Sequence, residues 1–468
     1  MSVPANPRHD LPVEVVERAM DRAAGSRPIP GNRVGILFDG PEVYPAMLDR
    51  IAAATRWIHF DNYIIRGDTT GRRFADALIE RAAAGVKVRV LTDWIGSFST
   101  RRRYWRAMRE AGVEIRFFNP PRFFELRQNL VRDHRKLLVV DGATAVTGGL
   151  CIGDEWSGRP EENRLPWRDT GCAIDGPAAA AMDHAFASLW GRLGAPLGDD
   201  ELAGDVASQG GTALRVISGE PGGVRAARAT ELLLAGAAER IWITDAYLVA
   251  PRGIYQGLLD AARDGVDVRV LVPGSSDLPH VRNLTRLSYR DLLAAGVRIF
   301  EWRGAMLHAK TIVSDARWVR IGSSNLNLSS LIANYEIDVL AEDPTLAHAM
   351  EVQYRRDIDQ SVEIKFKVRG AKPRRGFSAH HPVAEPSTSS AHRRHHPGLR
   401  ERRRGAVVAL WGLFTGARRT LYLQYSLALT VLGVLFLFFP RTMAGVFAGL
   451  SLYLATAAWL GSRNPPRP

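Results

Sequence analysis

The stretch HRKLLVVD at residues 134–141 recurs as HAKTIVSD at residues 308–315. Both copies follow the pattern His-x-Lys-x-x-x-x-Asp, 174 positions apart, with His134, Lys136 and Asp141 in the first copy and His308, Lys310 and Asp315 in the second. Seven residues after each Asp comes a pair of small residues, Gly148-Gly149 or Gly322-Ser323. Two matches in equivalent surroundings indicate an internal duplication.

The sequence around the motifs repeats in the same order. RWIHFDNYII at 56–65 corresponds to RIWITDAYLV at 240–249, GVKVRVLTDW at 85–94 to GVDVRVLVPG at 265–274, and AGVEIRFF at 111–118 to AGVRIFEW at 295–302. These runs are typical of buried strands, and helical segments such as FADALIERAAAG lie between them. The alternation predicts an α/β fold made of two duplicated α/β sandwich domains related by pseudo-twofold symmetry.

Charge and cysteine content narrow the class of protein. The chain of 468 residues has a formal net charge of +13, but residues 365–404 contain twelve Lys or Arg and two acidic residues, so the other 428 residues carry only about +3. The basic character therefore belongs to one segment and does not indicate a nucleic-acid-binding surface on the folded body. Only Cys151 and Cys172 are present, which excludes a disulfide framework and a cysteine-rich zinc site.

Composition changes divide the chain into five parts. We predict a flexible N-terminal segment over residues 1–31, a first α/β domain over 32–205 and a second over 206–365. A disordered basic linker follows over 366–404, and a membrane segment over 405–462 contains transmembrane helices at about 420–440 and 443–461.

The membrane segment is predicted from two uncharged runs. LYLQYSLALTVLGVLFLFF at 421–439 and AGVFAGLSLYLATAAWL at 444–460 contain 19 and 17 residues, close to the ~20 needed to cross a bilayer. Arg residues flank the pair on both outer sides, which favours an inner (cytoplasmic) membrane location with the catalytic domains facing the cytoplasm. The alternative is a buried helical pair in a third soluble domain.

The motif spacing suits phosphodiester chemistry. Residues two apart on a strand share a face, so His and Lys of each motif project together. Two such half-sites brought together supply two imidazoles and two ammonium groups: one imidazole can attack phosphorus while the other protonates the leaving alcohol. The lysines neutralise the phosphoryl oxygens, and the small residues Gly148, Gly149 and Ser323 should let backbone N–H groups approach an oxyanion. No metal or other cofactor is expected.

The paired motifs resemble the phospholipase D superfamily over residues 32–345, and with GNRVGILFDGPEVYPAMLDRIAAA they are similar to bacterial phospholipase D-type cardiolipin synthases. The resemblance implies that His134 forms a phosphohistidine intermediate and that His308 is the general acid and base. It also implies a carboxylate downstream of each motif that orients a histidine, which places Asp169 and Glu336 in these roles. Asp141 and Asp315 are expected to be structural.

One position departs from the family pattern. The family has Asn two residues beyond the small pair, and Asn325 matches it, but the first copy has Cys151. This departure puts one hydrogen bond of the first half-site in question. We expect Cys151 to be a buried, inert thiol.

The predicted function is a phosphatidyltransferase that makes cardiolipin from phosphatidylglycerol and releases glycerol. The alternatives are a phospholipase D that transfers the same group to water, a nucleic-acid phosphodiesterase of the same superfamily, and a membrane scaffold with a relic site. A membrane-anchored site meets phospholipid headgroups at high effective concentration, so phospholipid and membrane, and not nucleic acid, are the expected partners.

Overall fold

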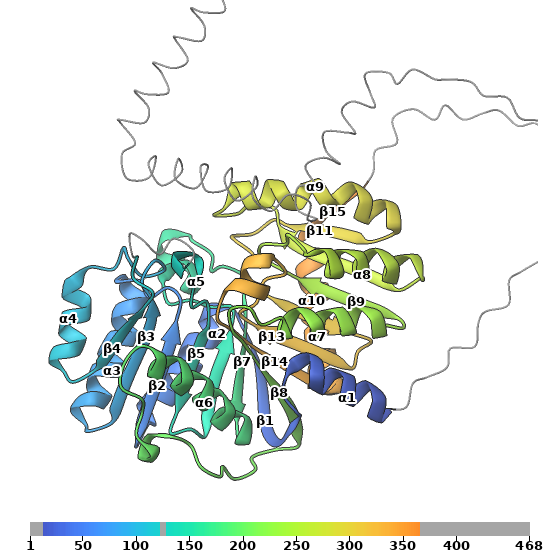
Figure 1. Ribbon diagram of the computed structural model, residues 1–468. Helices are drawn as coiled ribbons and strands as arrows, with labels where there is room; N and C mark the ends of the chain where they lie inside the picture. Colours follow the sequence, from blue (N-terminus) through green and yellow to red (C-terminus); the bar gives the residue numbers. More distant parts are fainter. Residues whose placement is uncertain (1–12, 122–127, 366–468) are drawn as a thin grey trace, which may run out of the picture. The chain divides into compact units, whose positions relative to one another are not determined.

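The computed structural model describes residues 13–121 and 128–365. In the first half, the β-rich runs form strands and the segments between them form helices (Figure 1). Its strands are β1 (Ile29–Phe38), β2 (Trp57–Asn62), β3 (Lys87–Asp93), β4 (Glu114–Phe118), β5 (Lys136–Val140), β6 (Thr144–Gly148) and β7 (Thr170–Asp175). Its helices are α2 (Asp39–Ala52), α3 (Thr69–Ala83), α4 (Arg102–Glu110), α5 (Asp154–Ser157) and α6 (Pro177–Arg192), with short 3-10 turns at Gln128–Leu130, Pro160–Glu162 and Asp199–Glu201.

The second half repeats this succession. Its strands are β8 (Thr212–Gly219), β9 (Arg240–Thr244), β10 (Asp267–Pro273), β11 (Arg298–Trp302), β12 (Thr311–Ser314), β13 (Trp318–Gly322), β14 (Glu336–Glu342) and β15 (Ser361–Ile364). Its helices are α7 (Arg225–Gly236), α8 (Arg252–Arg263), α9 (Pro279–Ala295) and α10 (Pro344–Asp359), with a π-helical turn, η4, at Ser329–Ala333.

The strands of the described residues form one mixed sheet that shows the duplication. The order in the first half is β1-β7-β6-β5-β2-β3-β4, and the second half has the corresponding order β8-β14-β13-β12-β9-β10-β11, with β15 added at the edge. Strands β2, β3 and β4 are parallel to one another, as are β9, β10 and β11, and the motif strand of each half, β5 or β12, is antiparallel to its neighbours. The predicted duplicated α/β fold is therefore present.

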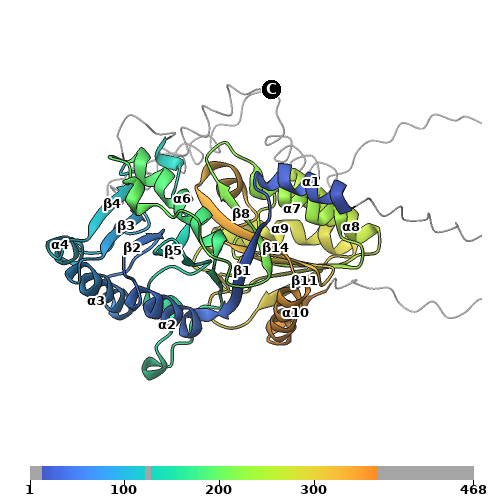
Figure 2. The same cartoon turned by 90° about the horizontal axis from the view of Figure 1, so that it is seen from below.

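Helices cover both faces of the sheet in each half (Figure 2). In the first half, α2, α3 and α4 pack on one face and α6 packs on the other. In the second half, α7, α8 and α9 cover one face and α10 the other. Strand β5 alternates between the two layers, since Leu138 and Val140 face α2 and α3 while Leu137 and Val139 face a core that both halves share. This shared core fixes the two halves against each other.

The N-terminal part differs from the prediction. Residues 13–24 of the segment expected to be flexible form helix α1 (Val13–Ala24), and β1 begins at Ile29. Met20 and Ala24 are buried in the core of the second half, and the carboxylate of Asp21 pairs with the buried Arg215 at 3.0 Å. Burial of one apolar helix face explains why this stretch is ordered, which its polar composition concealed.

Two other predictions cannot be compared with the structure. The basic linker at 366–404 and the membrane segment at 405–462 lie outside the described residues. None of the helices in residues 13–121 and 128–365 is long and apolar enough to cross a bilayer.

Candidate active site

The two motif histidines lie just before the strands β5 and β12, at the place where the halves meet. Backbone hydrogen bonds between the halves hold both segments: His134 N donates to the carbonyl of Tyr335 at 2.9 Å, and His308 N donates to the carbonyl of Arg168 at 2.7 Å. Each motif is thus held against the start of a strand, β14 or β7, of the opposite half. The backbone of each half positions the histidine of the other.

The carboxylates Asp169 and Glu336 are exchanged between the halves. His134 Nδ1 lies 2.9 Å from Glu336 Oε2, and His308 Nδ1 lies 2.8 Å from Asp169 Oδ2. Each carboxylate accepts the Nδ1 proton, which leaves the lone pair of Nε2 as the nucleophilic or basic position of each ring. The repeated motif indicated the two histidines and the family resemblance implied the two carboxylates, but neither indicated that each pair is formed across the halves.

The small residues after the motifs make room for these carboxylates. A Cβ on Gly149 would lie 2.1 Å from Asp169 Oδ1, so only glycine fits there. The second half has Ser323 at this position, and its Oγ lies 2.5 Å from Glu336 Oε2. Glu is one methylene longer than Asp, so its carboxylate can leave space for a serine side chain and bind its hydroxyl. The first half therefore combines Gly149 with Asp169, and the second half combines Ser323 with Glu336.

The expectation of a backbone oxyanion site at these residues is wrong. The N–H of Gly149 donates to the carbonyl of Thr170 at 3.2 Å, and the N–H of Ser323 donates to the carbonyl of Ile337 at 3.0 Å. Both N–H groups are already hydrogen-bonded to backbone carbonyls and are not directed at a ligand. At Gly148, with φ of +150°, a Cβ would lie 2.4 Å from the carbonyl of Thr170, so this glycine serves close strand packing.

The motif lysines are buried, and each contacts its own histidine's backbone. Lys136 Nζ donates to the carbonyl of His134 at 2.5 Å, and Lys310 Nζ donates to the carbonyl of His308. Burial lowers the pKa of Lys310 to about 8. The ammonium groups also lie over the rings of two tyrosines that occupy equivalent repeat positions, Tyr63 at 5.3 Å from Lys136 and Tyr247 at 5.8 Å from Lys310.

The motif aspartates lie at the opposite end of the motif strands. Asp141 and Asp315 both have positive φ, 52° and 51°. The carboxylate of Asp141 accepts from the backbone N–H of Thr55, Arg56 and Trp57, and that of Asp315 accepts from Ala238, Glu239 and Arg240. Each aspartate thus ties the turn after the motif strand to the start of the neighbouring strand, β2 or β9.

The surroundings of the two histidines differ. The side chain of His134 is 12% exposed and its ring contacts Tyr63, with centroids 4.9 Å apart. The side chain of His308 is 5% exposed. Three aromatic rings surround it: Trp156 at 5.6 Å, Trp167 at 5.7 Å and Tyr247 at 5.9 Å. The two tryptophans come from the first half and were not predicted; Trp167 stands only two residues before Asp169 in the sequence.

Burial and charge set the protonation of these groups. Burial lowers the pKa of His134, and burial together with the Lys310 charge lowers the pKa of His308 to about 3. For Glu336 and Asp169, burial opposes ionisation, but the paired histidine and nearby lysines outweigh it and hold the pKa of each carboxyl below its usual value. The carboxylates are therefore ionised and both imidazoles neutral near pH 7.

Cys151 and Asn325 occupy equivalent positions but have different contacts. Both side chains are buried. Asn325 Nδ2 donates to Ser330 Oγ at 3.4 Å, whereas burial raises the pKa of the Cys151 thiol. A raised pKa disfavours the thiolate, which is the reactive form of cysteine.

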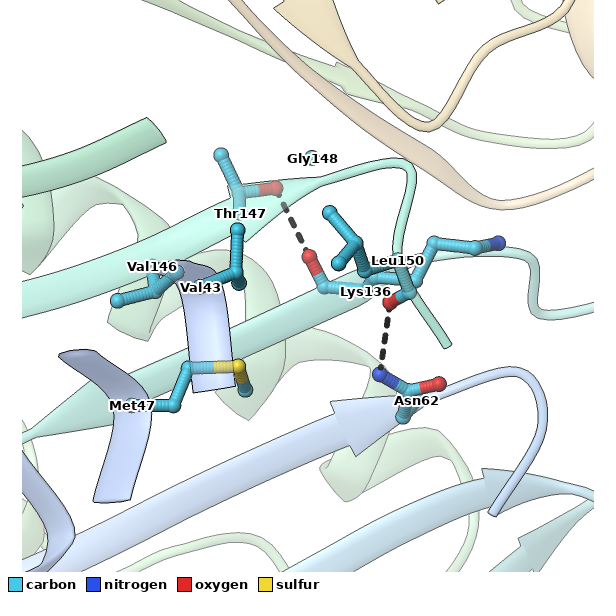
Figure 3. A pocket seen from close by; sticks show the side chains of 8 residues that line it. All are labelled: Val43, Met47, Asn62, Lys136, Val146, Thr147, Gly148 and Leu150. Atoms are coloured by element: carbon cyan, nitrogen blue, oxygen red, sulfur yellow. Dashed lines mark hydrogen bonds between the residues drawn. The ribbon is translucent and has the colours of Figure 1, made fainter. Parts of the chain in front are cut away.

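Two hollows border the site. A void of about 10 Å³ lies beside Lys136 and is lined by Asn62, Thr147 and side chains of α2 (Figure 3). A larger open pocket of about 500 Å³ borders Trp167 and contains Asp68, Arg159 and Leu165 in its wall. The first is too small for a phospholipid headgroup.

Comparisons with known proteins identify the family. Residues 47–190 and 232–358 match the family described as "Cardiolipin synthase, PLD-like domain". The chain belongs to this family. It is 34% identical to cardiolipin synthase A of Pseudomonas entomophila over 353 residues, which cover 74% of this chain and 73% of the relative. It is 32% identical to cardiolipin synthase 1 of Bacillus cereus over 392 residues, covering 80% and 75% of the two chains.

A solved structure supports the fold of this family member. The crystal structure of phosphatidylserine synthase from Haemophilus influenzae Rd KW20 superimposes with a TM-score of 0.60 at 15% identity, covering 75% of this chain and 92% of that one. The predicted resemblance to phospholipase D-type cardiolipin synthases is confirmed by the family match, and the chain is a phosphodiester-transfer enzyme of that family.

Proposed function

We propose that the chain transfers a phosphatidyl group from one phosphatidylglycerol to another, forming cardiolipin and releasing glycerol. The single observation that supports this most strongly is the exchange of carboxylates, Glu336 to His134 and Asp169 to His308, which makes one site out of two half-sites. The cardiolipin synthases with which the chain shares about a third of its residues support the choice of substrate.

In the first step, His134 Nε2 attacks the phosphorus of phosphatidylglycerol. An N–P bond forms, the bond from phosphorus to the glycerol oxygen breaks, and protonated His308 gives its Nε2 proton to the leaving oxygen. The bound phosphodiester carries one negative charge beside His308, which favours the imidazolium that burial and the charges of Lys310 and Lys136 otherwise disfavour. Lys136 and Lys310 neutralise the non-bridging oxygens.

In the second step, a glycerol hydroxyl of another phosphatidylglycerol attacks the same phosphorus. Neutral His308 takes the hydroxyl proton, the P–N bond breaks, and His134 is released unprotonated at Nε2. Cardiolipin leaves and His308 releases this proton to solvent, and it takes up a proton again when the next phosphodiester binds beside it. The ionised carboxylates Glu336 and Asp169 stabilise positive charge on the rings in both steps.

The test uses purified full-length protein and vesicles containing labelled phosphatidylglycerol. Cardiolipin and glycerol should form in equal amounts, and both His134→Ala and His308→Ala should lose the activity by about 10⁴-fold. His184→Ala on α6 and His348→Ala on α10 are matched controls, because both side chains are exposed and away from the site. Phosphatidic acid as the product would show that water is the acceptor, and DNA cleavage with inert lipid would overturn the proposal.

For the remainder of the chain we propose the arrangement expected from the sequence. Repeat domains over 32–205 and 206–365 are followed by the basic linker and a membrane segment over 405–462, with the site facing the cytoplasm. The supporting observation is the pair of uncharged runs at 421–439 and 444–460 with Arg outside both. If the two runs form a hairpin with both outer ends on the same side of the membrane, the cysteines of Arg441→Cys and Arg463→Cys should be labelled from opposite sides of the membrane.

A further inference from the structure

Exposed apolar side chains are concentrated around the candidate active site. Thirteen large hydrophobic residues are exposed in the described part of the chain. Nine of them lie in loops or short helical turns at the strand ends that carry the motif histidines, and two, Leu284 and Leu287, lie on α9, which begins at that end. The other two, Val15 and Val16, belong to α1. The turns at Asp141 and Asp315, at the opposite strand ends, contribute none of these thirteen. One end of the folded body is therefore distinctly apolar.

Two of the exposed apolar residues occupy equivalent positions of the repeat. Phe98 after β3 is 70% exposed, and Leu278 after β10, 180 positions later, is 47% exposed. Strands β3 and β10 have the same offset in the repeat, so the two side chains are equivalent. Apolar residues with no structural role are not expected to be exposed at both copies of one position. Their retention in both halves points to a shared task.

Each tip is linked to a motif histidine through one tyrosine. In the first half, the backbone at Gly96 packs against the carbonyl of Tyr63, whose ring contacts His134. In the second half, Asp277, next to Leu278, accepts the hydroxyl of Tyr247 at 2.8 Å, and Tyr247 contacts His308. Each of the two apolar tips therefore lies beside one of the two half-sites.

Other exposed leucines complete a ring of separate tips. We call the following six side chains the apolar rim: Phe98, Leu130, Leu165, Leu278, Leu287 and Leu328, which are between 47% and 75% exposed. They come from both halves: five lie in loops or turns at the strand ends that carry the motif histidines, and Leu287 lies on α9, which begins at that end. A folded partner seated on all six would cover the site and exclude its substrate. A lipid surface would bring the substrate with it.

Three exposed arginines follow Phe98 of the apolar rim in the sequence. Arg101, Arg102 and Arg103 are exposed and lie three to five residues after Phe98. No ion pair joins these three to an acidic residue within residues 13–121 and 128–365. An apolar tip beside unpaired arginines matches a bilayer surface, in which anionic headgroups lie above acyl chains.

We propose that the apolar rim is a docking surface for a phospholipid bilayer, into which its tips insert while Arg101–Arg103 contact anionic headgroups. The mouth of the site then faces the membrane, and a phospholipid reaches His134 without leaving the bilayer completely. This inference rests on the proposed function and specifies the state of its substrate as lipid within a bilayer.

The first test separates docking from chemistry. The double variant Phe98→Ser/Leu278→Ser and the control Val15→Ser/Val16→Ser are compared on phosphatidylglycerol vesicles and on short-chain phosphatidylglycerol below its micelle concentration. The rim variant should lose about tenfold or more on vesicles and stay within about twofold of the parent on monomeric lipid, whereas the control should match the parent on both. Equal loss on both substrates, or loss on neither, would overturn the proposal.

The second test does not depend on activity. Cys151 and Cys172 are buried, so a cysteine placed at Phe98 or Leu278 of the full chain can be labelled selectively with a fluorophore. In phosphatidylglycerol nanodiscs, lipids with a quencher on the upper acyl chain should quench labels at 98 and 278 but not at Val15. Equal quenching of labels at 15 and 98 would refute bilayer docking. So would labels at 98 and 278 that a second copy of the chain or residues 405–414 shield from solvent and that the lipids do not quench.

The two tests also separate failure of the inference from failure of the proposed function. If the parent protein is inactive on phosphatidylglycerol in every form, the proposed function fails. The nanodisc measurement still decides whether the rim enters a bilayer.

Discussion

The half-site of His134 and the half-site of His308 have the same motif but different surroundings. His134 is the more exposed ring, and among the described residues one aromatic ring, Tyr63, contacts it, whereas three contact His308. Two of those rings, Trp156 and Trp167, belong to the first half. The two half-sites therefore share their reactive groups, but the residues around these groups differ.

This difference fits a division of roles. A nucleophile must reach the phosphorus of a bulky lipid, which favours the more open ring. A proton donor and acceptor benefits from an enclosed position, because water that reached it could take the place of the lipid alcohol. We infer that Trp156 and Trp167 belong to the acid–base half-site and that they disfavour hydrolysis.

The largest expected effect comes from the exchanged carboxylates. Glu336→Gln and Asp169→Asn keep the size of the side chain but remove its charge, so the Nδ1 proton is no longer fixed and the rate should fall by about 10²- to 10⁴-fold. Since Glu336 contacts His134, its variant should slow formation of the covalent intermediate. Since Asp169 contacts His308, its variant should slow both proton transfers. Single-turnover kinetics measure the two steps, and a swapped assignment would contradict the pairing across halves.

The next effect tests why one half has Gly and the other Ser. Gly149→Ser places a Cβ about 2.1 Å from Asp169 Oδ1 and should cost at least about 10²-fold in activity. Adding Asp169→Glu should recover much of the loss, because the pair then copies Ser323 and Glu336. Steady-state assays of the single and double variants make the comparison. A double variant no better than Gly149→Ser would show that the Gly–Asp and Ser–Glu pairs are not interchangeable.

A smaller effect concerns stability in acid. The pKa of His308 is about 3 in the folded protein and ordinarily 6.5, so as pH falls below 6.5 the unfolded chain binds a proton at this site that the folded chain does not. Stability is lost as pH falls, by at most about 1.4 kcal/mol per pH unit for one proton. His308→Gln should flatten the dependence of Tm on pH between about 7 and 5, unlike His348→Gln at an exposed site. The same slope in both variants would exclude His308 as the cause.

The smallest effect is expected at Cys151. The thiol is 1% exposed and its pKa is raised, so it contributes packing and not reactivity. Cys151→Asn, which copies Asn325 of the other half, should change activity by less than about twofold, and cysteine-directed reagents should not inhibit the parent protein. Rapid inactivation by such a reagent that Cys151→Asn abolishes would show that the thiol is reactive.

The repeat in the sequence was sufficient to predict the duplicated α/β fold, because strand runs such as those beginning at Trp57 and Arg240 are local patterns with a common spacing. Asp169 and Glu336 were selected through the resemblance to the phospholipase D superfamily, which implies a carboxylate downstream of each motif. The sequence could not indicate that they exchange partners, since that depends on how the two halves pack. The same packing explains why α1 is ordered, through burial of Met20 in the second half.

The expected backbone oxyanion site failed for a different reason. Small residues have several uses, and the sequence alone did not distinguish between them. At Gly149 the missing side chain leaves space for a carboxylate, and the N–H of this residue is already bonded within the sheet. Only the positions of Asp169 and Thr170 decide between the two interpretations.

The most direct test of a single site with unequal histidines is to trap the covalent intermediate. His308→Ala protein is mixed with a phosphatidyl donor whose leaving group is p-nitrophenol, which departs without a proton donor, and is then digested and sequenced by mass spectrometry under alkaline conditions. A phosphatidyl group should accumulate on residue 134, because no base remains to activate the acceptor. No adduct on residue 134 after p-nitrophenol release, or an adduct elsewhere in the chain, would contradict the account.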